Sequence, residues 1–240
     1  MSILAKANES QPPSAEHDLR SFGRRRGRKP SARQAALLSG VLPSAALRLS
    51  EPPPADLGAL FAPRMEEVWL EIGFGGGEHL LWQARNHPCI GLVGCEPFED
   101  GVVKVLSAID REGLGNVRLH ADDARPLLRW LPAASIARAF ILFPDPWPKK
   151  RHRKRRLVSA ATLTELARSM RSGSELRLAT DVADYAHSIL VAVGEVGCFR
   201  WLADGPSDWR TRTADWPATR YEGKAVAAGR RCTYLRFRRT

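Results

Sequence analysis

From Val68 onward the chain alternates between two hydrophobic patterns. Short segments that are almost continuously apolar are each followed by a longer segment whose apolar residues recur at helical spacing. Along the chain these segments are VWLEIGF, GEHLLWQARN, IGLVGCE, FEDGVVKVLSAIDREG, NVRLHA, DARPLLRWL and IARAFILF. Strands that are apolar on both faces are typical of a parallel sheet covered by helices. The order therefore predicts a doubly wound α/β sheet with helices on both faces.

The strand and helix pattern continues toward the C-terminus, whereas the N-terminal residues lack it. After the last of these strands we expect a helix over 157–172, a strand at ELRLATD, a helix over 183–193, and strands near FRWLA and CTYLRF. Residues 1–20 are rich in Ser, Pro, Ala and charge, which predicts a disordered tail. Residues 21–60 predict a basic arm and an irregular segment packed on the domain, and residues 61–240 the folded domain, beginning near Phe61.

A glycine-rich turn joins the first predicted strand to a helix in LEIGFGGGEHL, where an open parallel sheet binds nucleotide-like ligands. Gly73, Gly75 and Gly77 permit a tight turn and close approach of a ligand to the backbone. The dinucleotide motif G-x-G-x-x-G requires glycine at position 78, where this chain has Glu78. The turn therefore departs from the NAD pattern.

Carboxylates follow three successive predicted strands. Glu71 ends the first, Glu96 closes the second, and Asp123 follows the third, with Asp122 as the alternative to Asp123. Each alone could be a solvated loop residue, but three beside the glycine turn favour a cationic ligand. S-adenosylmethionine carries an ammonium, a sulfonium and no phosphate, so it suits this acidic edge. We expect Glu96 to accept both ribose hydroxyls and Asp123 to meet the adenine amino group.

The segment ILFPDPWPKKRHRKRRLV follows the fourth strand. Asp145 lies between Pro144 and Pro146, so a stiff backbone holds its carboxylate at the carboxyl edge of the sheet. The next segment, 149–156, is basic at every position except His152: Lys149, Lys150, Arg151, Arg153, Lys154, Arg155 and Arg156. A turn aspartate beside a solvated basic face is the plain alternative, but it does not explain why the two adjoin at the predicted cleft.

The net charge of +11 favours a polyanionic partner. The positive charge is concentrated in three places, at 24–29, 149–156 and 230–239, and such clustering is typical of nucleic-acid binding rather than of general solubility. The four cysteines have no metal-site spacing, so we expect no metal. There is no apolar run of membrane-spanning length and no signal-peptide pattern, which predicts a cytoplasmic protein without membrane contact. No obligate protein partner is evident.

FPDPW followed by this basic run resembles the signature of the bacterial tRNA (guanine-N7-)-methyltransferase family. GRRRGRKPSARQAALL resembles the family's basic arm, ATDVADYA its segment after the fifth strand, and TRYEGKAVAAG its motif T-[KR]-[FY]-E. The resemblance covers roughly residues 22–237. Position 148 is Pro where the family often has His, so no proton-transfer role can be placed there.

The resemblance implies a Rossmann-like class I methyltransferase fold, mostly parallel with a C-terminal antiparallel strand. It implies S-adenosylmethionine as cofactor and tRNA as substrate, methylated at guanine N7 of position 46 in the variable region. The cofactor residues implied are Glu71, Glu96, Asp123 and Asp145, beside the three glycines, with Asp145 also catalytic. The RNA-contacting residues implied are the basic run, Asp181, Thr219, Arg220, Tyr221 and Glu222.

Two rival hypotheses remain from the sequence. One is a class I methyltransferase that acts on another RNA. The other is a non-catalytic RNA-binding protein with this fold, against which the acidic cluster counts, because a pure binder of polyanions gains nothing from buried carboxylates. Cofactor binding distinguishes an enzyme from such a binder.

Overall fold

The computed structural model describes Arg25, Gly27 and residues 29–240. The tail predicted over 1–20, and Arg24, Arg26 and Arg28 of the predicted arm, lie outside the described residues. Among the described residues no helix is long and apolar enough to cross a membrane.

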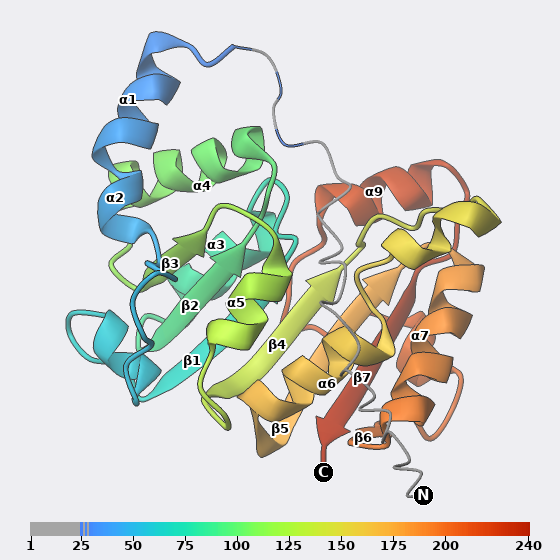
Figure 1. The fold of residues 1–240 in the computed structure, drawn as a ribbon. Coiled ribbons are helices and arrows are strands. Elements are labelled where there is room, and N and C mark those ends of the chain that lie inside the picture. Colours follow the sequence, from blue (N-terminus) through green and yellow to red (C-terminus); the bar gives the residue numbers. More distant parts are fainter. Residues whose placement is uncertain (1–24, 26, 28) are drawn as a thin grey trace, which may run out of the picture.

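The strands of the described residues form one seven-stranded sheet in the order β3-β2-β1-β4-β5-β7-β6 (Figure 1). Their bounds are β1 (Glu67–Ile72), β2 (Ile90–Cys95), β3 (Val117–His120), β4 (Ile136–Leu142), β5 (Met170–Thr180), β6 (Phe199–Trp201) and β7 (Thr233–Arg239). The first five strands are parallel, and β7 runs antiparallel to both of its neighbours. The predicted doubly wound sheet with a C-terminal antiparallel strand is confirmed. Its strand order reverses between β1 and β4, which is where such sheets bind ligands.

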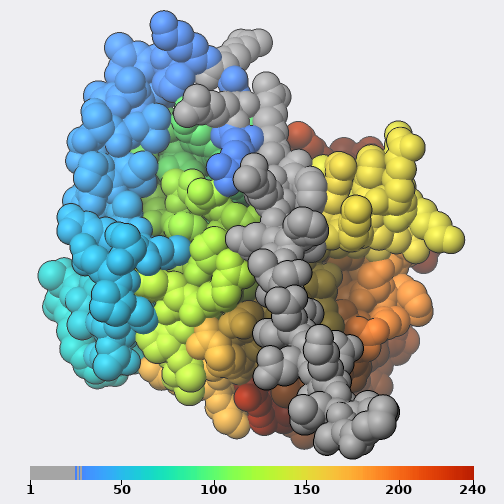
Figure 2. Space-filling view, in the orientation of Figure 1, coloured from blue at the N-terminus to red at the C-terminus, as the bar shows by residue number. Residues whose placement is uncertain are grey.

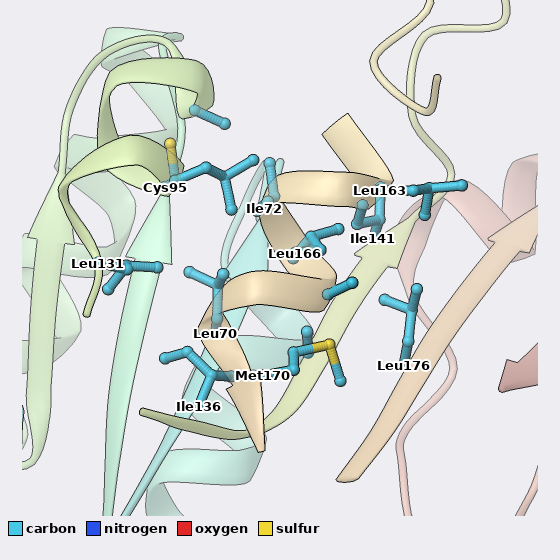
Figure 3. Close-up of a cluster of buried hydrophobic side chains, with 14 of the residues drawn as sticks. Leu70, Ile72, Cys95, Leu131, Ile136, Ile141, Leu163, Leu166, Met170 and Leu176 are labelled. Carbon is cyan, nitrogen blue, oxygen red and sulfur yellow. The ribbon is translucent and has the colours of Figure 1, made fainter. Parts of the chain in front are cut away.

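Helices cover both faces of the sheet, and each face has its own hydrophobic cluster. One cluster joins Leu70 and Ile72 of β1 to α5 (Ala124–Trp130), α6 (Ala160–Ser169) and α7 (Ala183–Val196). Figure 3 shows part of it, with Leu70, Ile141 and Leu166 pointing toward one another. The other cluster joins Trp69 and Phe140 to α3 (Glu78–Asn86) and α4 (Glu99–Glu112). Because successive side chains of β1 alternate between the clusters, the strand is apolar throughout, as the sequence predicted.

The segment before β1 is more regular than the sequence predicted. Helix α1 (Ala32–Gly40) begins with a capping box between Ser31 and Gln34, and α2 (Leu42–Ala45) and the 3₁₀ helix η1 (Leu57–Leu60) follow. Leu37 lies in the α3/α4 cluster and Leu57 in the opposite one. The Ser-x-x-Gln pattern at Ser31 and Gln34 could have predicted α1. The prolines farther along the segment instead favoured an irregular structure. The domain limits at 20, 60 and 61 stay predictions.

The helix expected over 157–172 is shorter at both ends. Ser159 caps α6 by accepting a hydrogen bond from the amide of Thr162 at 3.3 Å, and the chain enters β5 at Met170. The pairing of β4 with β5 then shifts register between Ile136 and Arg138, with Gly173 at φ +81° on the β5 side. An irregular strand start of this kind leaves no apolar period for the sequence to reveal.

Candidate active site

A cavity of about 310 Å³ lies at the carboxyl ends of the parallel strands, where the strand order reverses. Each of β1 to β4 contributes residues at or after its carboxyl end to the wall. These are Ile72, Gly73 and Gly75 for β1, Cys95, Glu96, Pro97 and Phe98 for β2, Asp123, Ala124 and Arg125 for β3, and Phe143, Pro144, Asp145 and Trp147 for β4. Arg155, Leu157 and Tyr221 complete it. The topology thus gathers residues that are far apart in the sequence.

The glycine turn adopts backbone angles that favour glycine. Gly73, Gly75 and Gly77 have φ values of +78°, +54° and +81°. A Cβ on Gly75 would lie 3.0 Å from the Tyr221 ring, and one on Gly77 would lie 2.3 Å from Val105 of α4. Gly73 and Gly75 therefore open the cavity wall, whereas Gly77 permits the packing of α3 on α4. A cofactor contact by these glycines stays a prediction.

Glu96 is the best-buried acid on the wall. Only 8% of its surface is exposed, and its carboxylate accepts hydrogen bonds from the amides of Gly75 at 2.8 Å and Phe98 at 2.9 Å. Burial raises the pKa of Glu96, and the charges of Asp145 and Glu71 act in the same direction. Three of the predicted carboxylates are therefore close enough to interact electrostatically.

The structure distinguishes Asp122 from Asp123. Asp123 lines the cavity and caps α5, accepting from the Arg125 amide at 2.8 Å and pairing with its guanidinium at 2.7 Å. Asp122 instead pairs with Arg25 of the basic arm, and about half of its side chain is exposed. The arm is held here a second time, because the Glu99 amide donates to the Arg25 carbonyl at 3.0 Å. Of the two alternatives, Asp123 is the one on the wall.

Glu71 does not line the cavity. Its side chain is 3% exposed and lies 2.7 Å from Nδ1 of His79, on the face of β1 that packs against α3. It directly precedes Ile72 and Gly73, which do line the cavity. Its place among the cofactor residues stays a prediction.

The loop that carries Asp145 is strained at both ends. Phe143 and Trp147 have φ values of +51° and +41°, a region that side chains other than glycine rarely adopt. Phe143 is fixed by its amide, which donates to the Ala179 carbonyl at 2.7 Å, and Arg156 Nε donates to the Pro146 carbonyl at 2.9 Å. Asp145 itself is exposed within the cavity wall. The surroundings thus enforce a backbone that presents this carboxylate to the cavity.

The basic run forms a short 3₁₀ helix, η2 (Lys150–Arg155), and Figure 2 shows this region, in yellow, projecting from the surface. Five of its side chains are exposed: Lys149, Lys150, Arg151, Arg153 and Lys154. Arg153 pairs with Asp184 at 2.7 Å, and the Arg155 guanidinium lies 5.1 Å from the centre of the Trp147 ring. Arg155, near the end of the run, lines the cavity, whereas the exposed cations of the run lie outside its lining.

Arg156 differs from the exposed residues of the basic run, and its RNA contact stays a prediction. Its side chain is 4% exposed, and it donates to Asp184 and Ser188, both at 2.5 Å, besides Pro146. The guanidinium also lies 4.7 Å from the centre of the Tyr185 ring. These contacts tie Arg156 to the Asp145 loop from inside the protein.

The TRYE segment, like the basic run, contains both exposed and buried side chains. Thr219 caps α9 (Arg220–Ala227), and Tyr221 is 43% exposed with Arg220 and Lys224 near its ring. Glu222 is 8% exposed and accepts hydrogen bonds from Tyr234 at 2.9 Å and Arg212 at 3.1 Å. Its carboxylate anchors the segment internally, and its RNA contact stays a prediction.

Asp181 and a residue of the C-terminal basic stretch 230–239 are both held by ion pairs. Asp181 pairs with Arg230 at 2.6 Å, and its RNA contact stays a prediction. Arg236, in the same C-terminal basic cluster, pairs with Glu175 at 2.5 Å. At least two cations of this stretch, Arg230 and Arg236, are therefore paired within the protein instead of forming one continuous basic surface. Among the described residues no group of three His, Cys, Asp or Glu could hold a metal ion.

Sequence reasoning missed several residues around the cavity. Phe143 and Arg125 line it, and His79 and Gln83 lie behind Glu71. His79 and Gln83 are four residues apart on the buried side of α3, and two polar side chains at that spacing on an apolar face were the available signal.

Three comparisons with known proteins agree with this geometry. Residues 65–235 match the family model described as "Putative methyltransferase". A tRNA (guanine-N(7)-)-methyltransferase of Rhodopseudomonas palustris is 48% identical, over 91% of this chain and 87% of the relative. One from Rhodospirillum rubrum is 47% identical, over 95% and 91%. Among solved structures, the 16S rRNA methyltransferase KamB matches with a TM-score of 0.55 at 16% identity, over 79% of this chain and 95% of that one, which shows a shared fold.

Proposed function

The chain belongs to the tRNA (guanine-N(7)-)-methyltransferase family, and from that premise we propose that it methylates guanine N7 at position 46 of tRNA, using S-adenosylmethionine. One observation carries the proposal. The loop after β4 joins a cavity lined by carboxylates directly to an exposed basic run, with Asp145 and Lys149 only four residues apart. A site for a cationic ligand therefore adjoins a site for a polyanion.

The residues present fit the methyl donor. The cavity of about 310 Å³ is of the size that small ligands occupy. Its acidic wall suits an ammonium and a sulfonium and would repel a pyrophosphate. We assign Glu96 to the ribose hydroxyls, Asp123 to the adenine amino group, and Glu71 and Asp145 to the charged end. When bound, the cofactor supplies an electrophilic methyl group.

Guanine N7 carries an in-plane lone pair and no hydrogen, so the reaction needs no general base. Asp145 therefore acts by position and charge. It holds the guanine edge or the cofactor amine, and it opposes the positive charge that N7 gains on methylation. Alignment supplies the rest, since oriented reactants reach effective molarities of about 10⁵ M or more.

We assign the RNA-contacting residues from the exposure of their side chains. We assign phosphate contacts to the five exposed cations of the basic run, Lys149, Lys150, Arg151, Arg153 and Lys154, with Arg155 beside them. Tyr221 lies over Gly75 at the cavity mouth, where it can stack on a base. We also assign RNA contacts to Asp181, Thr219 and Arg220, as the family resemblance implies.

The test is transfer of labelled methyl from S-adenosylmethionine to unmodified tRNA transcripts. We expect incorporation into a transcript with guanine at position 46, with chain cleavage at that site after reduction and aniline. The matched transcript with adenine at 46 should stay unlabelled. Equal labelling of both transcripts, or none with the cofactor bound, would refute the assignment.

A further inference from the structure

A buried chain of hydrogen bonds runs from the end of β1 into α3. Glu71 Oε2 lies 2.7 Å from His79 Nδ1, and His79 Nε2 lies 3.0 Å from Gln83 Nε2. The exposed fractions of Glu71, His79 and Gln83 are 3%, 1% and 0%. None of the roles assigned above uses His79 or Gln83.

The partners of Gln83 assign the hydrogens on His79. Gln83 Nε2 also lies 3.3 Å from the main-chain oxygen of Asp215, which can only accept. Both amide hydrogens are then donated, so His79 Nε2 accepts and Nδ1 carries the hydrogen that it donates to Glu71. Rotating the amide by 180° would bring two oxygens together at Asp215. The observed orientation leaves Gln83 Oε1 buried without a partner among the described residues.

The imidazole is also fixed by packing. Its ring centre lies 4.5 Å from that of Phe140, edge to face, and 5.7 Å from that of Trp216. The residue next to Trp216, Asp215, is itself held by Arg177 at 2.7 Å. A donor placed this rigidly can hold one carboxylate oxygen in a single direction.

We propose that His79 is a positioning residue: its Nδ1 hydrogen holds Glu71 Oε2, so that Oε1 is directed to the amino group of the methyl donor. This inference rests on the proposed function. It assigns Gln83 the task of keeping the required tautomer. Glu71 does not line the cavity by itself, so its orientation depends on what holds it from behind.

The experiment measures binding to the full chain rather than methyl transfer. S-adenosylhomocysteine carries the amino-acid end, and 5′-methylthioadenosine lacks it, so the ratio of their Kd values reports the contacts to that end, and its change in a His79 variant reports the part that depends on His79. We compare His79→Leu, which removes the donor, with His79→Asn, whose amide nitrogen replaces Nδ1. His87→Leu is the matched control, since His87 caps the same helix and packs on Trp69 with a ring separation of 4.9 Å.

We expect His79→Leu to weaken S-adenosylhomocysteine about tenfold or more, the range for losing a hydrogen bond to a charged group, with 5′-methylthioadenosine unchanged. His79→Asn and His87→Leu should retain the wild-type ratio. Gln83→Met should shift the ratio in the same direction by less, and it serves if His79→Leu does not fold.

Three outcomes would each overturn the proposal. They are equal weakening of both ligands in His79→Leu, an unchanged Kd ratio in both His79→Leu and Gln83→Met, and a loss of affinity in His79→Asn equal to that in His79→Leu. Failure of the proposed function is visible separately. A wild-type protein that binds S-adenosylhomocysteine selectively but methylates no tRNA would refute the reaction and leave this positioning role intact.

Discussion

The acids of the cavity and the cations of the basic run meet at the loop after β4 but are held in different ways. Glu96 and Asp123 accept hydrogen bonds from main-chain amides of the turns beside them, so their positions are set by the sheet. Lys149, Lys150, Arg151 and Lys154 extend from a short 3₁₀ helix with exposed side chains. Fixed charges suit recognition of a small ligand, whereas exposed ones suit a long polyanion whose phosphates share the attraction.

The comparison predicts its largest effect at Asp145, where the strained loop fixes a charge at the cavity. Asp145→Asn should lower the single-turnover rate by about 10²-fold, the usual cost of removing one group that stabilises developing charge. Rapid-quench methylation of tRNA with saturating cofactor measures it. Asp122→Asn, a matched change of a carboxylate that faces the arm, should stay within about twofold in the same assay. Normal turnover of Asp145→Asn would remove the role assigned to that charge.

The second prediction separates Arg156 from the rest of the basic run. Arg156→Leu should lower the free energy of unfolding by about 2 kcal/mol, because Asp184, Ser188 and the Pro146 carbonyl lose a buried cationic donor. Arg151→Leu, which changes an exposed member of the run, should cost no more than about 0.5 kcal/mol. Urea denaturation of both variants measures the difference. Equal stability would mean that the buried contacts of Arg156 contribute nothing net.

The pH dependence of cofactor binding sharpens the comparison at Glu96. Burial raises the pKa of Glu96 above the value of 4.5 for an ordinary glutamate. The ionised carboxylate is the form that best accepts hydrogen bonds from the ribose hydroxyls, and as the pH falls it is lost earlier than in an ordinary glutamate. Cofactor affinity should therefore fall as the pH drops toward that range. The stability contribution has the opposite sign, because a raised folded-state pKa makes the ionised form unfavourable above it and protonation relieves that cost.

Titration calorimetry with S-adenosylhomocysteine checks the expectation for Glu96. Glu96→Gln should bind about tenfold more weakly at neutral pH and lose most of the acid dependence. Glu99→Gln, in the first turn of α4, is the matched control and should keep the wild-type profile. An unchanged acid dependence in Glu96→Gln would assign the titration to another group.

The smallest effects belong to the exposed cations. Lys150→Ala should weaken tRNA binding a few-fold at low salt and reduce the slope of log K against log salt by about 0.7 to 0.9, the share of one phosphate contact. Lys104→Ala is the matched control, since Lys104 is exposed on α4, away from the basic run (Figure 1). Filter binding across a salt series measures both slopes. Equal slopes for Lys150→Ala and the wild type would exclude a phosphate contact there.

The sequence by itself determined the sheet, the glycine turn and the line of strand-end carboxylates. The hydrophobic periodicity and the glycine positions are local features of the sequence, so they predict elements without knowledge of the tertiary contacts. Asp123, rather than Asp122, reached the cavity wall as expected. The sequence also identified the family, because the FPDPW motif and the basic run that follows it are contiguous in the chain and need no tertiary structure to be recognised.

Only the tertiary structure decided which charged side chains face the ligand side and which are used internally. Arg155 and Arg156 are adjacent and chemically alike, yet one lines the cavity and the other is buried against Asp184. Glu222 turned inward to Tyr234, and His79 met Glu71 across two elements. The reason is physical: a long side chain takes its direction from partners brought near by folding, and neither residue type nor spacing contains that information.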